Sequence, residues 1–267
     1  MLSFPGHEPI TQPGTQVRPA TEPLGTTTAS YARKHLTGMF PYLPQQSGYN
    51  KRLRAALGLI KRVIRMLAKS SDFWLDDCWI VDSTPVPCGM SRPTVKRSDL
   101  AGWAGYGYCA SHSRFFWGLR LYLVCTPAGM PILGALADPK IGEREVLAAM
   151  LEVEAGIVAA HDGILLISDK GFAGRAFEGL LADYGITLLR PSRKREKARY
   201  GEPMLKKVRQ LIESVNDTLK GQLDLEGHGG RSCAGVVAQR ILAMAAAIWL
   251  NNLTGAPITR SLIAYDH

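Results

Sequence analysis

Three carboxylates in this sequence are spaced as divalent-metal ligands would be. Asp82 follows the apolar run 78–81, and Asp169 follows the largely apolar run 164–168. Glu213 lies further along, in a segment whose apolar residues recur at helical spacing. A pair of hard cations such as Mg²⁺ needs carboxylates that converge from different elements. The trio therefore predicts magnesium-dependent chemistry on phosphodiesters.

Taken alone, an aspartate after an apolar strand more often caps a turn or a helix than does chemistry. Here both aspartates are expected at or near the carboxyl ends of strands, where open α/β sheets place their ligands. The residues that follow, Ser83-Thr84-Pro85 and Lys170-Gly171-Phe172, are expected to expose them. These two features favour a functional role.

The segment 204–222 predicts a helix, because five apolar residues form one stripe: Leu205, Val208, Ile212, Val215 and Leu219. At about 100° per residue, Arg209, Glu213 and Lys220 fall within roughly 40° of one another on a second stripe. Such a helix would bring one carboxylate and two cations to the edge of the sheet. The alternative is an ordinary surface pair between Arg209 and Glu213.

The pattern along the chain predicts an α/β fold with a mixed sheet between helices. Strands are expected at 79–82, 115–125, 131–137, 164–167 and 186–189, and helices at 51–69, 143–155, 173–183 and 204–222. Residues 1–30 are rich in Pro, Thr and Gly and are expected to be disordered. The order of elements favours one large domain in this 267-residue chain.

The net charge of +9 predicts an anionic partner, with nucleic acid favoured over an acidic membrane surface or a ribosome. The densest basic block, 190–207, favours contact with DNA over a solvated loop. The helix 51–69 also carries seven cations and no acid, and a solvated face explains this charge as well as phosphate contact does. Trp103, Tyr106 and Tyr108 could stack on unpaired bases or pack a glycine-rich loop onto the sheet.

Five scattered cysteines without a C-x-x-C pair favour a reducing cytosol. No signal peptide is evident at the start of the sequence. The most apolar stretch, 241–250, is about half of what a bilayer requires, so a buried helix in a soluble protein is expected.

Three motifs make a family resemblance specific. The segments Val81–Pro85, Ser168–Phe172 and Arg209-x3-Glu213-x6-Lys220 resemble the DDE transposases of bacterial insertion sequences, which have a ribonuclease-H-like core. The stretches 94–103 and 116–121 are similar to one group, the insertion sequence 982 family. The likeness runs from about Lys34 to the C-terminal region. Related transposases often carry a Tyr three residues before the Arg, and position 206 here is Lys.

The resemblance implies a ribonuclease-H-like mixed sheet and metal-dependent cleavage and transfer of DNA strands. In such a site Asp82, Asp169 and Glu213 hold two Mg²⁺ ions, and Mn²⁺ is expected to substitute. The residues expected to hold DNA phosphates are Arg209, Lys220, Lys170, Lys96, Arg97, Arg193, Lys194 and Arg195. The expected partners are element ends and target DNA, with a homodimer on DNA and no membrane, in the bacterial cytoplasm near the nucleoid. The alternatives are a nuclease that does not join strands and an inactive or repurposed DNA-binding remnant.

The resemblance also implies a domain organisation. Residues 73–256 are expected to form the catalytic domain and 31–72 the helical remnant of an N-terminal DNA-binding region, between a disordered segment at 1–30 and a tail at 257–267. Residues 1–30 do not resemble the helical domain with which family members begin. A truncated or altered N-terminus is therefore expected.

Overall fold

The computed structural model describes residues 37–39, 42–89, 95–96, 98, 100, 102–109, 113–161, 163–197, 199, 201–226 and 233–257. The predicted disorder of residues 1–30 and the candidate DNA-binding residue Arg97 lie outside these ranges. Of the predicted tail, only the first residue is described.

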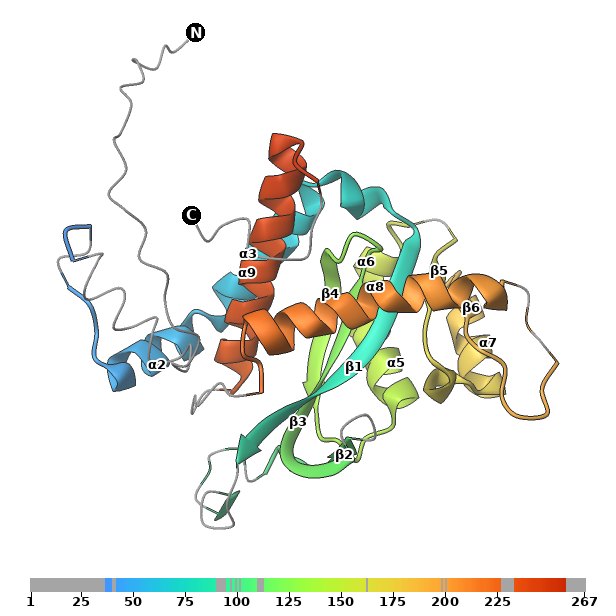
Figure 1. Ribbon diagram of the computed structural model, residues 1–267, viewed down its shortest axis with the longest axis horizontal. Helices are drawn as coiled ribbons and strands as arrows, with labels where there is room; N and C mark the ends of the chain where they lie inside the picture. Colours follow the sequence, from blue (N-terminus) through green and yellow to red (C-terminus); the bar gives the residue numbers. More distant parts are fainter. Residues whose placement is uncertain are drawn as a thin grey trace, which may run out of the picture.

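One mixed sheet forms the centre of the described chain (Figure 1). Its strands are β1 (Cys78–Gly89), β2 (Gly105–Cys109), β3 (Arg114–Cys125), β4 (Pro131–Ala137), β5 (Leu165–Ile167) and β6 (Thr187–Leu189). The order is β2-β3-β1-β5-β6, and β4 pairs with β3. β3 is antiparallel to β1, β2 and β4, whereas β1, β5 and β6 run parallel. Read from β4 instead of β2, the strand order is β4-β3-β1-β5-β6, and its second strand, β3, is antiparallel to both of its neighbours. This topology confirms the predicted ribonuclease-H-like sheet.

Helices cover both faces of this sheet. One apolar cluster joins one face, through Ile80 and Leu121, to α3 (Leu57–Lys69), α8 (Leu205–Asp217) and α9 (Cys233–Thr254). The other cluster joins the opposite face, through Trp79 and Tyr122, to α5 (Glu143–Val153), α6 (Ala155–Val158) and α7 (Arg175–Asp183). The two clusters follow from the alternation of side chains along each strand. In Figure 1, α8 crosses β1 on the near side of the sheet.

The first strand is longer than predicted, which corrects the expected position of Asp82. β1 continues to Gly89, so Asp82 lies within the strand instead of at its carboxyl end. Pro85 and Pro87 interrupt the sequence pattern, because proline cannot donate to a ladder. They are tolerated because β1 pairs with β5 only at residues 78–80, so beyond Ile80 that edge carries no ladder with β5.

The predicted helix 51–69 is two helices, α2 (Gln46–Ala55) and α3, separated at Ala56. The predicted helix 204–222 likewise consists of α8 and a π-helical segment, η5 (Thr218–Gln222). A π-helix turns less per residue than an α-helix, so the angular argument from Glu213 to Lys220 fails beyond Asp217. The common stripe expected for Lys220 therefore stays a prediction.

The apolar helix near the C-terminus is also longer than predicted. α9 has 22 residues, so by length and composition it could cross a membrane, which corrects the expectation that it is too short. Eleven of its residues are buried, among them Val237, Met244 and Ile248. The predicted burial of this helix is confirmed, since it packs against α3 and the sheet.

Candidate active site

The two aspartates follow the paired strands β1 and β5. Ile80 pairs with Ile167, and both side chains belong to the apolar cluster beneath α8. This ladder ends at Ile80 and Ile167, two residues before each aspartate. The sequence placed both aspartates at or near strand ends. In the structure Asp82 lies in the middle of β1, and Asp169 lies two positions beyond β5, at the start of a turn.

Asp82 is tied to its surroundings by both carboxylate oxygens. The backbone N–H of Ser83 donates to Oδ1 over 2.8 Å, and the side-chain amide of Asn216 donates to Oδ2 over 2.7 Å. Asn216 is buried on α8, on the side that packs against the sheet. A bond this short to a carboxylate is charge-assisted and is roughly twice as strong as one between neutral groups.

Asn216 was missed by the sequence reasoning, although a signal existed. It lies between Val215 and Leu219 of the apolar stripe, where a buried amide needs a partner. It also lies three residues after Glu213, so the two side chains are neighbours on the helix. Glu213 itself is exposed, one helical turn from the contact with Asp82.

Asp169 begins a short 3₁₀ turn, η3 (Lys170–Phe172), and accepts a hydrogen bond from the backbone N–H of Gly171 at 2.8 Å. This capping role is the structural alternative that the sequence left open, and it uses one of the four oxygen lone-pair directions of the carboxylate. Lys170 is exposed on the turn. Phe172 is buried beneath it and fixes the turn to the core.

The donor chemistry of the three acids fits Mg²⁺, which prefers carboxylate oxygens. The structure does not bring the three acids together as closely as metal binding requires. Within the described ranges, no three His, Cys, Asp or Glu side chains are grouped closely enough to hold a metal ion. Asp82 and Asp169 each lie two residues beyond the paired part of β1 and β5, and Glu213 lies on the helix that contacts Asp82, but the three do not form a ready-made set of ligands.

The structure describes one of the two cations expected beside Glu213. Lys220 is half-buried in η5, beyond the α-helical part of the segment. Arg209 belongs to α8, but its side chain lies outside the described part. Lys96 is exposed in the segment between β1 and β2.

A carboxylate that the sequence reasoning missed lies close to the residues around both aspartates. Glu143, the first residue of α5, accepts hydrogen bonds from Ser83 and Arg120, each over 3.0 Å. Its only sequence signal was an acidic residue in the first turn of a predicted helix, where acids are common.

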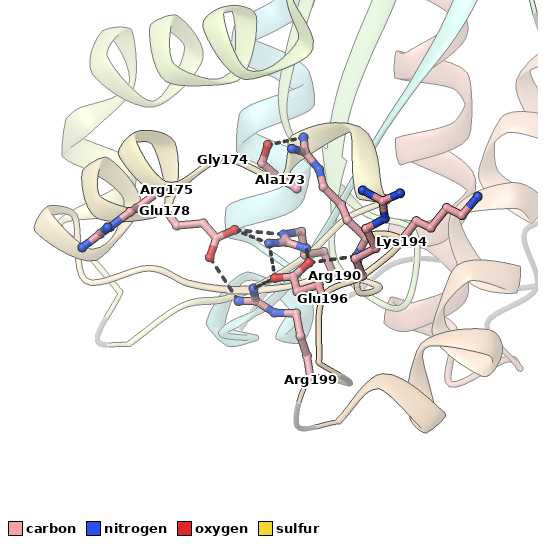
Figure 2. Close-up of a pocket in the computed structure, with 10 residues that line it drawn as sticks. Ala173, Gly174, Arg175, Glu178, Arg190, Lys194, Glu196 and Arg199 are labelled. Atoms are coloured by element: carbon pink, nitrogen blue, oxygen red, sulfur yellow. Dashed lines mark hydrogen bonds and ion pairs between the residues drawn. The ribbon is translucent and has the colours of Figure 1, made fainter.

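A basic pocket adjoins the turn that bears Asp169 (Figure 2). Six cations and two carboxylates are among its lining residues: Arg175, Arg190, Arg193, Lys194, Arg195, Arg199, Glu178 and Glu196. Arg193 donates to the backbone carbonyl of Ala173 over 2.6 Å, which ties the basic segment 190–199 to the residue that follows the Asp169 turn. The structure therefore brings Arg193, Lys194 and Arg195 together.

The floor of this pocket is a square of charges. Arg190 is buried and donates to Glu178 at 2.7 Å and to Glu196 at 2.8 Å, and Arg199 donates to the same two carboxylates at 3.1 Å. Figure 2 shows Arg190 between the two carboxylates, with the Lys194 side chain extending away from them. The hydrogen bond from Arg190, with help from the Arg193 backbone N–H, lowers the pKa of Glu196 to about 2. Burial raises the pKa of Glu178, but Arg190 and Arg199 outweigh it, and the net shift is downward.

The aromatic residues near β2 are exposed. Trp103 is 75% exposed and Tyr106 56%, which disfavours the interpretation that they pack a loop onto the sheet. Tyr108 contacts the ring of Phe115 with 5.0 Å between centroids.

Comparisons with known proteins identify the family. A model described as the transposase DDE domain matches residues 75–233, more than half of the chain. No curated protein compared with the chain matches it in sequence.

Three solved structures are similar in part. The catalytic core domain of BIV integrase is 12% identical, with a TM-score of 0.38, over 67% of this chain and 97% of that one. The catalytic domain of Mos1 mariner transposase is 13% identical, with a TM-score of 0.27, over 77% and 95%. The Mos1 transposase paired-end complex with the left transposon end is 11% identical, with a TM-score of 0.32, over 91% and 82%. These low scores carry no argument, and the family match over residues 75–233 stands by itself: the chain belongs to the family of proteins with a transposase DDE domain.

Proposed function

We propose that this protein is the transposase of an insertion sequence of the 982 family and that it cleaves and transfers DNA strands with Asp82, Asp169 and Glu213. The proposal is supported by the family match over residues 75–233 and by the parallel pairing of β1 with β5, which ends two residues before each aspartate. The hydrogen bond from Asn216 to Asp82 also supports a role for the third acid, because it holds α8, the helix that bears Glu213, against β1 at Asp82.

The proposed roles follow from oxygen chemistry. Asp82, Asp169 and Glu213 would together hold the two Mg²⁺ ions. Bound ions would supply charge neutralisation and a nucleophile for in-line attack on a phosphodiester. The protein's own contribution is to hold Asp82 through Asn216 and Asp169 through the backbone N–H of Gly171.

The DNA partner is proposed from charge. The basic pocket and Lys170 flank the Asp169 turn, so a phosphate backbone that lies along them would pass the proposed catalytic centre. Lys96, Arg97, Arg209 and Lys220 are proposed to add contacts elsewhere on the DNA. The exposed rings of Trp103 and Tyr106 fit stacking on unpaired bases at a cleaved end.

Further parts of the proposal extend beyond the catalytic centre. Residues 73–256 form the proposed catalytic domain and 31–72 the remnant of a DNA-binding region. A homodimer assembled on two element ends and a place in the bacterial cytoplasm complete the proposal. Each follows from the family resemblance.

Incubation with labelled terminal repeats, a target plasmid and Mg²⁺ tests the function. Joined products support a transposase, and nicks alone identify a nuclease. A gel shift without cleavage identifies a DNA-binding remnant. Asp82→Asn should abolish cleavage and keep DNA binding, whereas an active Asp82→Asn protein would refute the assignment.

A further inference from the structure

Glu143 is held at the start of α5 by two donors from two strands. Its Oε1 accepts from Ser83 Oγ at 3.0 Å on β1 and from Arg120 Nη1 at 3.0 Å on β3. Arg120 Nη1 also donates to Ser83 Oγ at 3.1 Å, so the three side chains form a closed triangle. The Arg120 and Glu143 side chains are only 20% and 26% exposed, so solvent screens this pair less than a pair at the open surface.

The second carboxylate oxygen of Glu143 points to a different element. A Cβ added to Gly171 would lie less than 3.0 Å from Glu143 Oε2 and 3.0 Å from Asp169 Oδ1. Gly171 therefore lies between these two carboxylates, and its backbone N–H donates to the Asp169 side. A side chain at this position would displace the Glu143 carboxylate.

These contacts connect the surroundings of the two aspartates. Ser83 is the neighbour of Asp82 in β1, and the alternation of a strand directs its side chain to the opposite face. Gly171 lies two residues beyond Asp169. Glu143 thus bonds, from the face that α5 covers, the residue beside one aspartate, and its carboxylate lies against the turn that bears the other.

We propose that Glu143 is a positioning residue, which fixes the Asp169 turn relative to β1 through Ser83, Arg120 and Gly171. The inference rests on the proposed function for its catalytic meaning. Its structural part stands on the contacts alone. Glu143 acts through Asp169 and Asp82 and is not itself assigned to metal or substrate.

Hydrogen exchange of the turn 169–174 tests the structural part. Glu143→Ala should speed the exchange of the Gly171 amide about tenfold, because the turn loses its support and opens locally. Glu145→Ala is the matched control, since Glu145 lies exposed in the first turn of the same helix. Unchanged exchange in a folded Glu143→Ala protein overturns the proposal. If that variant does not fold, Ser83→Ala serves instead, with the same direction expected.

A pair of compensating substitutions tests the contact itself. Gly171→Ala alone should speed exchange of the turn, since its Cβ would meet the Glu143 carboxylate. Shortening that carboxylate by one methylene, with Glu143→Asp, should make room and restore slower exchange in the double variant. Additive effects of the two substitutions would contradict the contact, because independent sites add and coupled ones do not.

Metal binding tests the catalytic part. Replacing a residue that positions metal ligands typically lowers metal affinity 10- to 100-fold. Glu143→Ala should therefore weaken Mn²⁺ binding by at least about tenfold, and Glu145→Ala should leave it unchanged. Affinity equal to wild type overturns the catalytic part. A wild-type protein that neither binds Mn²⁺ nor cleaves DNA marks failure of the proposed function instead, and the exchange result still decides whether Glu143 holds the turn.

Discussion

The side-chain amide of Asn216 donates to Asp82 Oδ2 over 2.7 Å and so joins α8 to the middle of β1. The contact is buried on the Asn216 side, where an unpaired amide would cost free energy. Because Glu213 lies one turn earlier on the same helix, the position of this third acid depends on the contact.

Replacing Asn216 with alanine should lower the free energy of unfolding by about 1.5–3 kcal/mol, the range for a hydrogen bond to a charged group. Denaturant unfolding measures the loss. Asn252→Ala is the control, because Asn252 donates to Asp72 at 3.0 Å in an exposed pair. An equal loss at both positions would show that burial of the Asn216 contact has no special value.

Replacing Asn216 with aspartate should make stability depend on divalent cations. A second carboxylate 2.7 Å from the position of Asp82 Oδ2 repels it, unless a cation lies between the two. The melting temperature should therefore fall in EDTA and recover in millimolar Mg²⁺. Asn252→Asp should show no such recovery. A variant that Mg²⁺ does not rescue would speak against a metal site at Asp82.

The charge square beneath the basic pocket should weaken in acid. Glu196 has a folded pKa of about 2 against an ordinary value of 4.5, so its stabilising contribution is complete above pH 4.5. That contribution is lost as the pH falls through the folded pKa. The NMR resonance of the Glu196 carboxyl carbon should therefore titrate with a midpoint at about pH 2. A midpoint near 4.5 would mean that Arg190 does not hold this carboxylate in solution.

The pocket cations should contribute to DNA affinity through counterion release. Lys194→Ala and Arg195→Ala should each reduce the slope of log affinity against log salt by about 1, with little dependence on DNA sequence. Fluorescence anisotropy with a labelled duplex at several salt concentrations measures the slope. Lys140→Ala, exposed in the loop between β4 and α5, is the control. Unchanged slopes in both pocket variants would show that the pocket does not contact DNA phosphates.

The close approach of β1 and β3 should make Gly118 irreplaceable. A Cβ there would meet the backbone carbonyl of Val86, beside the irregular register at Pro87 and Gly89. Gly118→Ala should therefore destabilise the fold by about 1–3 kcal/mol, the usual cost of overpacking. Gly179→Ala in α7 has open space around its Cβ and should instead stabilise by about 0.5–1 kcal/mol. Thermal unfolding compares the two, and equal effects would contradict the close approach.

The sequence predicted the sheet well where apolar runs were bounded by clear turns. The hairpin of β3 and β4 and the buried strand that leads to Asp169 follow from period-two or fully apolar patterns. It failed at β1, because Pro85 and Pro87 suggest a loop, and only the missing partner beyond Ile80 makes them acceptable in a strand. It also failed at η5, since helical phase was extrapolated through a π-helical turn.

The candidate site shows a similar division. Asp82 and Asp169 were predictable because each ends an apolar run, whatever the true length of the strand. The partners of Asn216 and Glu143 were not, because these contacts join residues 134 and 60 positions apart. No local pattern encodes such contacts.

The central claim is that Asp82, Asp169 and Glu213 form one metal centre. Isothermal titration of Mn²⁺ into the wild-type protein and into Asp82→Asn, Asp169→Asn and Glu213→Gln tests it most directly, with Asp183→Asn on the exposed side of α7 as control. The account predicts binding by the wild type and the control and a loss of affinity in each of the three variants. Undiminished binding in any one of the three would contradict it.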